Sequence, residues 1–427
     1  MHLSGLVSKR SNGAQLPVLR AEHRGHNLVM KLASRLDRIE PFYVMECAKT
    51  AAEIAASPAC DPARGGSRMI FLNIGEPDFT APPLVQEAAE RAMRAGRTQY
   101  TQATGLPELR ERISEWYRSR FGLDVPARRI VVTAGASAAL QLACLALVDR
   151  GDEVLLPDPS YPCNRHFVSA AEGVPVLLPA SADDRYQLSA HSVRDAWGER
   201  TRGVLLASPS NPTGTSIDPD EMARIIATVR ERSGFTLVDE IYLGLSFDER
   251  FGHSALMHEQ AGDDSIVSIN SFSKYFCMTG WRLGWLVLPD ALVPAVEKLA
   301  QNLYICASTV AQHAALACFE AESIAEYERR RAEFRARRDF LVPALCKLGL
   351  PVPVMPDGAF YAWADCSAHS TNSWDFVFDL MRRAHVAITP GRDFGHHGSE
   401  RFIRLSYANS MAQLEESVHR LGRALAR

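Results

Sequence analysis

The sequence predicts an α/β protein with a mainly parallel central sheet, helices on both faces of that sheet, and a smaller α+β domain. Short apolar runs alternate with helical stretches from Arg129 onward, which is typical of parallel strands joined by crossover helices. Polar clusters directly follow several of these runs, and ligands bind at the carboxyl ends of strands in such sheets. The length of 427 residues suffices for a large α/β unit with a second domain.

The strands of the large sheet are predicted from short runs that are mostly apolar, as expected for strands buried on both faces. They are Ile130–Thr133, Glu153–Pro157, Val174–Leu178, Gly203–Ala207, Thr236–Asp239, Ile266–Asn270 and Gly284–Leu288. Helices are predicted between most of them, for example over Ser137–Leu147, Asn164–Ala171 and Pro219–Glu231.

The longest uncharged run extends from Ile130 to Val148 and is long enough to suggest a membrane span. Its first residues are β-branched, and Thr133, Gly135 and Gln141 interrupt the apolar sequence. We therefore predict a buried strand followed by a buried helix, and no association with a membrane.

Beyond the large sheet, a long helical run is predicted from Asp290 through Glu320. The next segment, Ile324–Phe340, contains six arginines interleaved with four acidic residues. This pattern favours a solvated helix over a nucleic-acid surface. Its single core stripe is predicted to be Tyr327, Phe334 and Leu341. Gly358–Ala364 and Phe402–Ser406 are predicted to be strands of the smaller domain.

The composition argues against several classes of partner. Lys and Arg total 47, Asp and Glu total 50, and the net charge is −3, so no global field favours nucleic acid or an anionic membrane. The nine cysteines include no C-x-x-C pair, which indicates reduced thiols in a cytoplasmic protein. No metal site is predicted. Residues 1–35 carry six basic residues and one acid without an apolar signal segment, so we expect a disordered extension or a start codon placed too early.

The most informative motif is Ser271-Phe272-Ser273-Lys274, with Arg282 eight residues after the lysine. A lysine amine condenses with an aldehyde as a Schiff base, and hydroxyls beside a guanidinium hold phosphate. The cluster therefore suits a cofactor that carries both an aldehyde and a phosphate. The alternative, a surface lysine in a serine-containing loop, is weakened by the residues found upstream.

Two predicted strand ends carry side chains that suit the ring of such a cofactor. Asp239 ends an apolar run, where a carboxylate is costly unless it is paired. A pyridinium nitrogen is a suitable partner, and an N-cap or salt bridge is the alternative. Tyr242 could donate to a ring oxygen or be an ordinary half-buried tyrosine. The loop Ser208–Gly214 contains two prolines and either aims the Asn211 amide into a cleft or is a plain turn.

Three further positions could contact the cofactor or its substrate. Gly135-Ala136-Ser137 opens a predicted helix, and free N–H groups at a helix start bind anions. Tyr161 lies between prolines and could stack on a planar ring or belong to the core. Arg404 alternates with apolar residues in a predicted strand and could pair with a carboxylate or form a surface salt bridge.

Taken together, these residues resemble the pyridoxal-phosphate-dependent aminotransferases of class I/II, which have fold type I, from about Leu36 to the C-terminus. The matching segments occur in the order found in that family, which makes the resemblance specific. They are Leu72–Phe79, Tyr100-Thr101 with Gly105 and Leu109-Arg110, Thr133–Gly135, Pro159–Pro162, Asn211–Gly214, Asp239–Tyr242, Ser271–Lys274 and Arg404–Ser406.

The resemblance implies a role for each residue toward pyridoxal 5'-phosphate. Lys274 is expected to carry the cofactor as an internal aldimine and to move the substrate proton, while Asp239 pairs with the pyridine nitrogen. The ring oxygen is expected to contact Tyr242 and Asn211, and Tyr161 to lie against the ring. The expected phosphate ligands are Ser271, Ser273, Arg282 and the amides of Ala136 and Ser137. The expected ligands of the substrate carboxylate are Arg404, Gly75 and Asn211.

The resemblance also implies an organisation for the chain. Residues 36–75 and 305–427 are expected to form the small domain, and residues 76–304 the large cofactor-binding domain. Tyr100 is expected to reach the cofactor phosphate of a neighbouring subunit, so the active unit is expected to be a homodimer. The Asn211–Pro212 peptide bond is expected to be cis.

The implied function is transfer of an amino group from an L-amino acid to a 2-oxo acid such as 2-oxoglutarate or pyruvate. An alanine-like or apolar donor is favoured over aspartate, because Ser137 matches a position where some aspartate-specific relatives carry lysine. The alternative is that another arginine, including one of the partner subunit, takes the second carboxylate of aspartate. The segment Arg38–Glu46 is expected to place apolar side chains near the substrate. The alternatives are a C–S β-lyase or an aminocyclopropane-carboxylate-synthase-like enzyme of the same fold, and a cofactor-binding regulator, which the complete residue set argues against.

Overall fold

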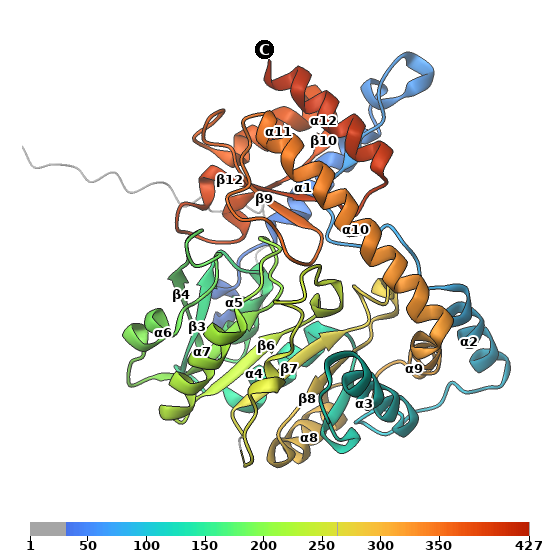
Figure 1. Ribbon diagram of the computed structural model, residues 1–427, viewed down its shortest axis with the longest axis vertical. Helices are drawn as coiled ribbons and strands as arrows, with labels where there is room; N and C mark the ends of the chain where they lie inside the picture. Colours follow the sequence, from blue (N-terminus) through green and yellow to red (C-terminus); the bar gives the residue numbers. More distant parts are fainter. Residues whose placement is uncertain (1–30, 263, 427) are drawn as a thin grey trace, which may run out of the picture.

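The computed structural model describes residues 31–262 and 264–426. Within them, one seven-stranded sheet and two small sheets are formed. Figure 1 shows the large sheet in the lower part of the molecule, with the small sheets and three helices above it. These helices are α1 (Tyr43–Ala55), α11 (Ser373–Ala384) and α12 (Met411–Leu425). Of the extension over residues 1–35 that was expected to be disordered, residues 1–30 lie outside the described residues.

The large sheet has the strand order β2-β8-β7-β6-β5-β3-β4. Only β8 runs antiparallel to its neighbours, so the predicted, mainly parallel sheet is confirmed. The strands are β2 (Ile130–Thr133), β3 (Glu153–Asp158), β4 (Val174–Pro179), β5 (Thr201–Ala207), β6 (Phe235–Asp239), β7 (Ile266–Ser271) and β8 (Gly284–Val287). Their bounds agree with the sequence prediction to within two residues.

Helices cover both faces of this sheet, because successive strand residues point to opposite sides. Val131 packs in a cluster with Leu140, whereas the next residue, Val132, packs in a second cluster with Trp116. The helices around the sheet are α3 (Pro107–Phe121), α4 (Ala136–Leu147), α5 (Pro162–Ala170), α6 (Ala190–Ala196), α7 (Pro219–Glu231) and α8 (Val293–Leu303).

The uncharged run from Ile130 to Val148 is the buried strand β2 followed by helix α4, as predicted. Its length is therefore divided between two short elements. Across the described residues, no helix combines the length and apolar character needed to cross a bilayer.

The prediction of one helical run from Asp290 through Glu320 is wrong in one respect. The structure divides it into α8 and α9 (Thr309–Leu316). The first helix ends where Ile305 takes a left-handed φ of 70°, and its N–H bonds back to the carbonyl of Ala300 at 2.9 Å. A new helix then begins because the Ser308 side chain accepts a hydrogen bond from the Ala311 N–H.

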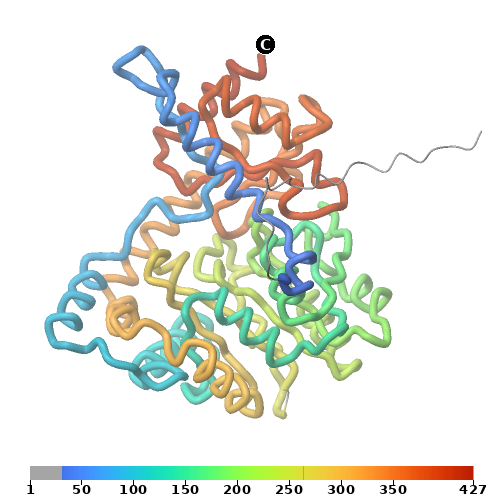
Figure 2. The backbone as a smooth tube through the Cα atoms, turned by 180° about the vertical axis from the view of Figure 1, so that it is seen from behind, coloured from blue at the N-terminus to red at the C-terminus, as the bar shows by residue number. Residues whose placement is uncertain are grey.

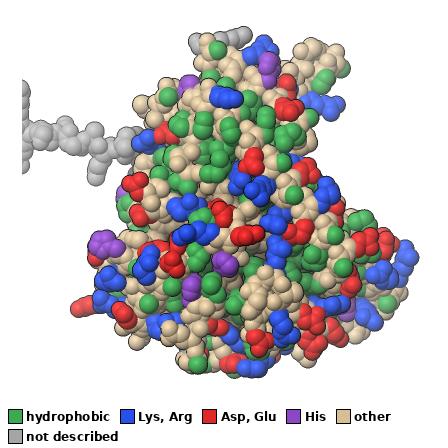
Figure 3. Space-filling model, viewed as in Figure 1, with side chains coloured by type: hydrophobic (Ala, Val, Ile, Leu, Met, Phe, Trp, Pro, Cys, Tyr) green, Lys and Arg blue, Asp and Glu red, His purple; other side chains and the backbone are tan. Residues whose placement is uncertain are grey.

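The charge-dense segment lies in the long helix α10 (Ala321–Lys347). The predicted core stripe of Tyr327, Phe334 and Leu341 is fully buried. Along the same helix, basic and acidic side chains are interspersed in Figure 3, and Arg329 pairs with Glu326 at 2.8 Å. The helix is therefore a solvated element with one buried stripe, as predicted.

The small sheets join distant parts of the chain. One is the antiparallel sheet β11-β12-β9, and the other pairs β1 with β10 in parallel. Their strands are β1 (Ile70–Phe71), β9 (Tyr361–Asp365), β10 (Val386–Ala387), β11 (Thr389–Pro390) and β12 (Phe402–Ser406). The predicted strand over Gly358–Ala364 begins three residues later than expected, because the N–H groups of Asp357 and Gly358 both bond to the Gly214 carbonyl.

The described chain begins beside the large sheet. The 3₁₀ helix η1 (Ser34–Arg38) lies near α5, and Figure 2 shows this first segment against the back of the sheet. Arg35 pairs there with Glu172 at 3.4 Å. Helix α2 (Pro83–Arg94) packs against α9 at the other end of the molecule. The expected boundaries between a small and a large domain stay a prediction.

Candidate active site

The predicted cofactor residues meet at one edge of the large sheet. Six strands, β2 to β7, end at this edge, and the antiparallel strand β8 begins there. The side chains come from the loops that follow or precede these strands, which is where a parallel sheet binds ligands. They are Ala136 and Ser137 after β2, Tyr161 after β3, Asn211 after β5, Asp239 and Tyr242 at the end of β6, Ser271, Ser273 and Lys274 at the end of β7, and Arg282 before β8.

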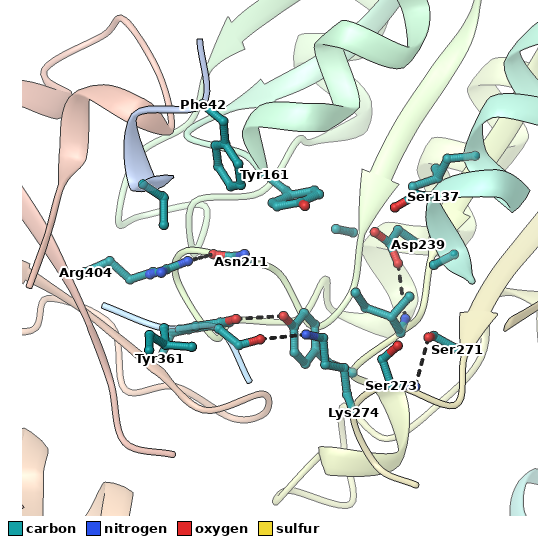
Figure 4. Close-up of a pocket in the computed structure, with 18 of the residues that line it drawn as sticks. Phe42, Ser137, Tyr161, Asn211, Asp239, Ser271, Ser273, Lys274, Tyr361 and Arg404 are labelled. Carbon is teal, nitrogen blue, oxygen red and sulfur yellow. Dashed lines mark hydrogen bonds between the residues drawn. The ribbon is translucent and has the colours of Figure 1, made fainter. Parts of the chain in front are cut away.

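A cavity of about 310 Å³ opens at this edge, and all of these residues line it together with Gly75 and Arg404 (Figure 4). Tyr100 is the exception among the predicted site residues. Its side chain is 78% exposed and lies outside the cavity. A single chain therefore brings together every predicted site residue except Tyr100, which was expected to serve a neighbouring copy of the chain.

Lys274 is held inside the cavity by its amine. The Nζ atom donates a hydrogen bond of 2.6 Å to the carbonyl oxygen of Gly75, as Figure 4 shows. Burial lowers the pKa of this amine from 10.5 to about 8, partly offset by the nearby carboxylate of Glu76. A neutral amine is therefore accessible near physiological pH, which a nucleophilic or basic lysine requires.

Asp239 presents a buried carboxylate with an unused oxygen. Its Oδ1 accepts a hydrogen bond of 3.2 Å from the Ile241 N–H, and within the described chain the other oxygen has no hydrogen-bond partner. Burial raises the pKa of this carboxyl from 3.8 to about 7. A cation placed against the free oxygen would restore the ionised form, so the site is built for a positively charged ligand group.

A set of anion-binding groups surrounds the start of α4. Gly135 has a φ of 85°, and a Cβ at this position would lie 2.7 Å from Nη2 of Arg282. Glycine therefore lets the guanidinium approach the first N–H groups of the helix. Ser271 and Ser273 line the same end of the cavity, and among the described residues Arg282 has no carboxylate partner. These groups together fit a phosphate.

Arg404 lies on the opposite wall, on strand β12, and is 3% exposed. Its Nη1 donates to Oδ1 of Asn211 at 2.9 Å and its Nη2 donates to the carbonyl of Asn73 at 2.7 Å. Within the described chain it pairs with no carboxylate, and its Nε has no partner. A buried guanidinium held only by neutral acceptors is suited to a carboxylate ligand.

The loop that carries Asn211 has the backbone expected from the resemblance. The Asn211–Pro212 peptide bond is cis. The amide oxygen of Asn211 is engaged by Arg404, so its Nδ2 group is available to donate into the cavity. Tyr161 also lines the cavity, where its ring meets that of Phe42 edge to face at 6.2 Å.

Sequence reasoning missed Tyr361, whose hydroxyl lies 2.8 Å from that of Tyr242. It also missed the Asn73 carbonyl and the Thr389 hydroxyl, both of which accept from Arg404. The strand that carries Tyr361 was predicted, but its pairing with β12 was not. That pairing puts Trp363 opposite Arg404, so Tyr361 is a diagonal neighbour of the arginine on the same face of the sheet.

Comparison with known proteins agrees with this geometry. The aminotransferase class I and II family profile matches residues 67–421. A valine–pyruvate aminotransferase of Mycobacterium tuberculosis is 36% identical over 384 residues, which are 90% of this chain and 96% of that protein.

Two solved structures are similar over nearly the whole chain. An aminotransferase crystal structure from Mycobacterium tuberculosis superposes with a TM-score of 0.86 at 36% identity, covering 93% of this chain and 99% of the other. The aspartate aminotransferase of Thermus thermophilus with maleate gives a TM-score of 0.84 at 31% identity, covering 92% and 100%. The chain therefore belongs to the pyridoxal-phosphate-dependent aminotransferases of class I and II.

Proposed function

We propose that this aminotransferase takes the amino group of a small or apolar L-amino acid, alanine-like in its side chain, and passes it to a 2-oxo acid such as pyruvate or 2-oxoglutarate. One observation carries the choice of donor. Among the described residues that line the cavity, the only Lys or Arg side chains are those of Lys274, Arg282 and Arg404. Each is assigned to another group of cofactor or substrate, so among the described residues of this chain none is left for a second substrate carboxylate.

The residues present fit pyridoxal 5'-phosphate. When bound, this cofactor supplies an electron sink for the bond-breaking at the substrate Cα. The unused oxygen of Asp239 suits the protonated ring nitrogen, and the Asn211 Nδ2 and Tyr242 hydroxyl groups suit the ring oxygen. Tyr161 is placed to lie against the ring. The phosphate would be held by Ser271, Ser273, Arg282 and the N–H groups of Ala136 and Ser137.

Lys274 is proposed to be the lysine that carries the cofactor and moves the proton. Its lowered pKa, about 8, leaves a useful fraction of the amine neutral at physiological pH. The Gly75 carbonyl, at 2.6 Å from Nζ, fixes the direction in which the amine points. In its neutral form the amine can accept a proton from the Cα of a substrate held in the cavity and return it.

Arg404 is proposed to orient the substrate through its α-carboxylate. After the bonds to Asn211 and Asn73 are made, the Nη1 group keeps one donor for a carboxylate. Such a buried pair fixes the position of the substrate carboxylate. The side chain of the substrate then points toward the remaining wall of the cavity.

That wall is apolar. The segment before α1 and its first turn, which the sequence placed near the substrate, contributes Phe42, Val44 and Met45 to the lining, and Ile74 adds to it. A second carboxylate would lose hydration there without gaining a partner. The valine–pyruvate name of the Mycobacterium tuberculosis relative supports an apolar donor. The Thermus thermophilus structure is named as an aspartate aminotransferase, so membership of the family does not by itself identify the amino donor.

We further propose a cytoplasmic homodimer in which Tyr100 reaches the cofactor phosphate of the partner. The exposed ring of Tyr100 sits on a loop tied to the start of α9. The Thr309 hydroxyl donates to the Gln99 carbonyl at 2.7 Å, and Gln312 donates to the Thr101 hydroxyl at 3.1 Å. These bonds hold the loop that presents the ring of Tyr100, which is 78% exposed.

The test is a half-reaction without any 2-oxo acid. L-alanine, L-valine and L-aspartate are added separately to the cofactor-loaded enzyme, and the visible band of the cofactor and the 2-oxo acid formed are both followed. We expect one 2-oxo acid per site, with kcat/KM for alanine or valine at least about tenfold above that for aspartate. Faster reaction with aspartate would contradict the proposed donor. Ammonia and 2-oxo acid released over many turnovers would indicate a lyase.

A further inference from the structure

Tyr361 contributes a buried hydroxyl that the proposed function leaves unused. The residue lies on β9 and is 1% exposed. Its hydroxyl is 2.8 Å from the hydroxyl of Tyr242, and its ring lies 4.5 Å below the guanidinium carbon of Arg404. Figure 4 shows the labelled Tyr361 and Arg404 on the same side of the cavity, facing Lys274. One side chain therefore touches both the residue proposed for the cofactor ring and the residue proposed for the substrate carboxylate.

The two hydroxyls share one hydrogen bond, in which either oxygen can be the donor. Burial raises the pKa of Tyr242 and of Tyr361 above 10, so both keep their protons at neutral pH. Only one proton can lie between two oxygens. Within the described chain, the Tyr361 hydroxyl has no other hydrogen-bond partner than the Tyr242 hydroxyl. If Tyr361 donates, the proton of Tyr242 is left to point at an acceptor in the cavity.

Gly75 makes this contact sterically feasible. A Cβ at residue 75 would lie 2.5 Å from the Tyr361 hydroxyl oxygen, a distance that forces one of them to move. The carbonyl of the same glycine accepts the hydrogen bond from Lys274. The absence of a side chain at this position lets the tyrosine hydroxyl reach the place where Lys274 and Tyr242 face each other.

Arg404 strengthens the donor. A cation over the face of a phenol draws electron density from the ring and makes the hydroxyl a better donor. A hydroxyl that receives a stronger hydrogen bond in turn donates a stronger one. A carboxylate bound to Arg404 offsets its charge, and so weakens the whole chain from Tyr361 through Tyr242 to the acceptor.

We propose that Tyr361 is a positioning residue that aims the Tyr242 hydroxyl at the phenolic oxygen of pyridoxal phosphate and couples carboxylate binding at Arg404 to that hydrogen bond. This inference rests on the proposed function, in which Tyr242 faces the ring oxygen and Arg404 binds the carboxylate. It adds Tyr361, which orients the Tyr242 hydroxyl and responds to the charge of Arg404.

The test is a spectrophotometric pH titration of the cofactor-loaded enzyme without amino acid, with and without propionate as a carboxylate that cannot react. A donor on the phenolic oxygen competes for the proton that this oxygen shares with the lysine nitrogen, and so lowers the titration midpoint. Tyr361→Phe removes only the hydroxyl. We expect it to raise the midpoint by about 0.3 unit or more.

Propionate should raise the midpoint of the wild type, because it offsets the charge of Arg404. In Tyr361→Phe this second shift should be clearly smaller, while the Kd of propionate stays within about twofold. Tyr407→Phe is the matched control. Tyr407 is a fully buried tyrosine outside the cavity whose hydroxyl donates to the Gly358 carbonyl at 3.4 Å, and its loss should leave both shifts at wild-type values.

Two further variants distinguish a failure of the role proposed for Tyr242 from a failure of the inference about Tyr361. Tyr242→Phe should raise the midpoint more than Tyr361→Phe does, and Gly75→Ala should raise it by displacing the Tyr361 hydroxyl. If Tyr242→Phe has no effect, the proposed role of Tyr242 fails and this inference fails with it. If Tyr242→Phe moves the midpoint and Tyr361→Phe does not, the inference alone is wrong. Equal shifts in Tyr361→Phe and Tyr407→Phe would also overturn it, because they would show a general packing effect.

Discussion

Arg404 donates a hydrogen bond of 2.9 Å to the amide oxygen of Asn211. This contact joins the two halves of the cavity, because Arg404 belongs to the small antiparallel sheet and Asn211 follows strand β5 of the large sheet. It also fixes the amide so that its nitrogen faces the cavity. The groups proposed for substrate carboxylate and cofactor ring therefore hold each other in place.

Replacing Arg404 with lysine keeps the charge but removes the planar fork. A lysine amine cannot donate to Asn211, to the Asn73 carbonyl and to a carboxylate with the same geometry. We expect kcat/KM for the amino donor to fall about 100-fold, mostly through KM, with the cofactor spectrum retained. Steady-state kinetics checks this. A normal KM with loss of cofactor would contradict the role given to Arg404.

The lowered pKa of Lys274 predicts how the apoenzyme captures its cofactor. The neutral amine is the nucleophile, and burial lowers its pKa from 10.5 to about 8. The rate of recombination with pyridoxal phosphate should therefore fall about tenfold per unit below pH 8 and level off above it. Stopped-flow absorbance between pH 6.5 and 9.5 measures this. A rate that still rises steeply at the upper end would indicate an ordinary lysine.

Asp239 is expected to destabilise the apoenzyme. Its folded-state pKa is raised from 3.8 to about 7, so the folded form holds this proton more tightly than the unfolded chain does. Its contribution to stability is therefore favourable at low pH and is lost as pH rises through 7. Asp239→Asn should stabilise the apoenzyme at pH 8 by at least about 1.4 kcal/mol, with a smaller gain at pH 5, while holoenzyme activity falls strongly.

Chemical denaturation of the apo forms at both pH values checks this, with Glu240→Gln as the control. The buried Glu240 carboxylate accepts hydrogen bonds from the Ser254 and Ser268 hydroxyls and from the Ala255 N–H. Burial also raises the pKa of Glu240 to about 7, but unlike Asp239 this carboxylate is held by several donors. Its replacement should therefore destabilise the protein, because it leaves donors without an acceptor. A destabilised Asp239→Asn apoenzyme at pH 8 would contradict the conclusion that the second oxygen of this carboxylate has no internal partner.

Adding a cation to the cavity should change the donor preference. Ser137 lines the cavity at the start of α4, and Ser137→Lys would supply the positive charge that a second carboxylate needs. The ratio of kcat/KM for aspartate to that for alanine should rise about tenfold or more. Ser137→Met, which adds similar length without charge, should leave the ratio low. An equal response of both variants would mean that size and not charge sets the preference.

The parallel sheet was predictable because its strands are buried on both faces and so appear as apolar runs. The polar residues at their ends, from Asn211 to Lys274, were predictable because each immediately follows such a run. Their convergence on one cavity follows from the parallel strand directions. In each case the pattern of a few neighbouring residues was enough to predict the strand and the polar side chains after it.

Tyr361 and the break before α9 were not predictable in this way. Tyr361 acquires its role from the pairing of β9 with β12, which is a contact between distant parts of the chain. The break at Ile305 depends on a left-handed backbone at a β-branched residue, which runs against its local preference. The role of Tyr100 depends on a second copy of the chain, and it stays a prediction.

The most direct test of this account is to locate the lysine that holds the cofactor. The sequence contains six lysines. The loaded enzyme is reduced with borohydride, digested, and mapped by mass spectrometry. We predict a single pyridoxyl group on Lys274, and none in the Lys274→Ala variant. A label on any of the other five lysines, or an unchanged label and rate in the variant, would contradict the account.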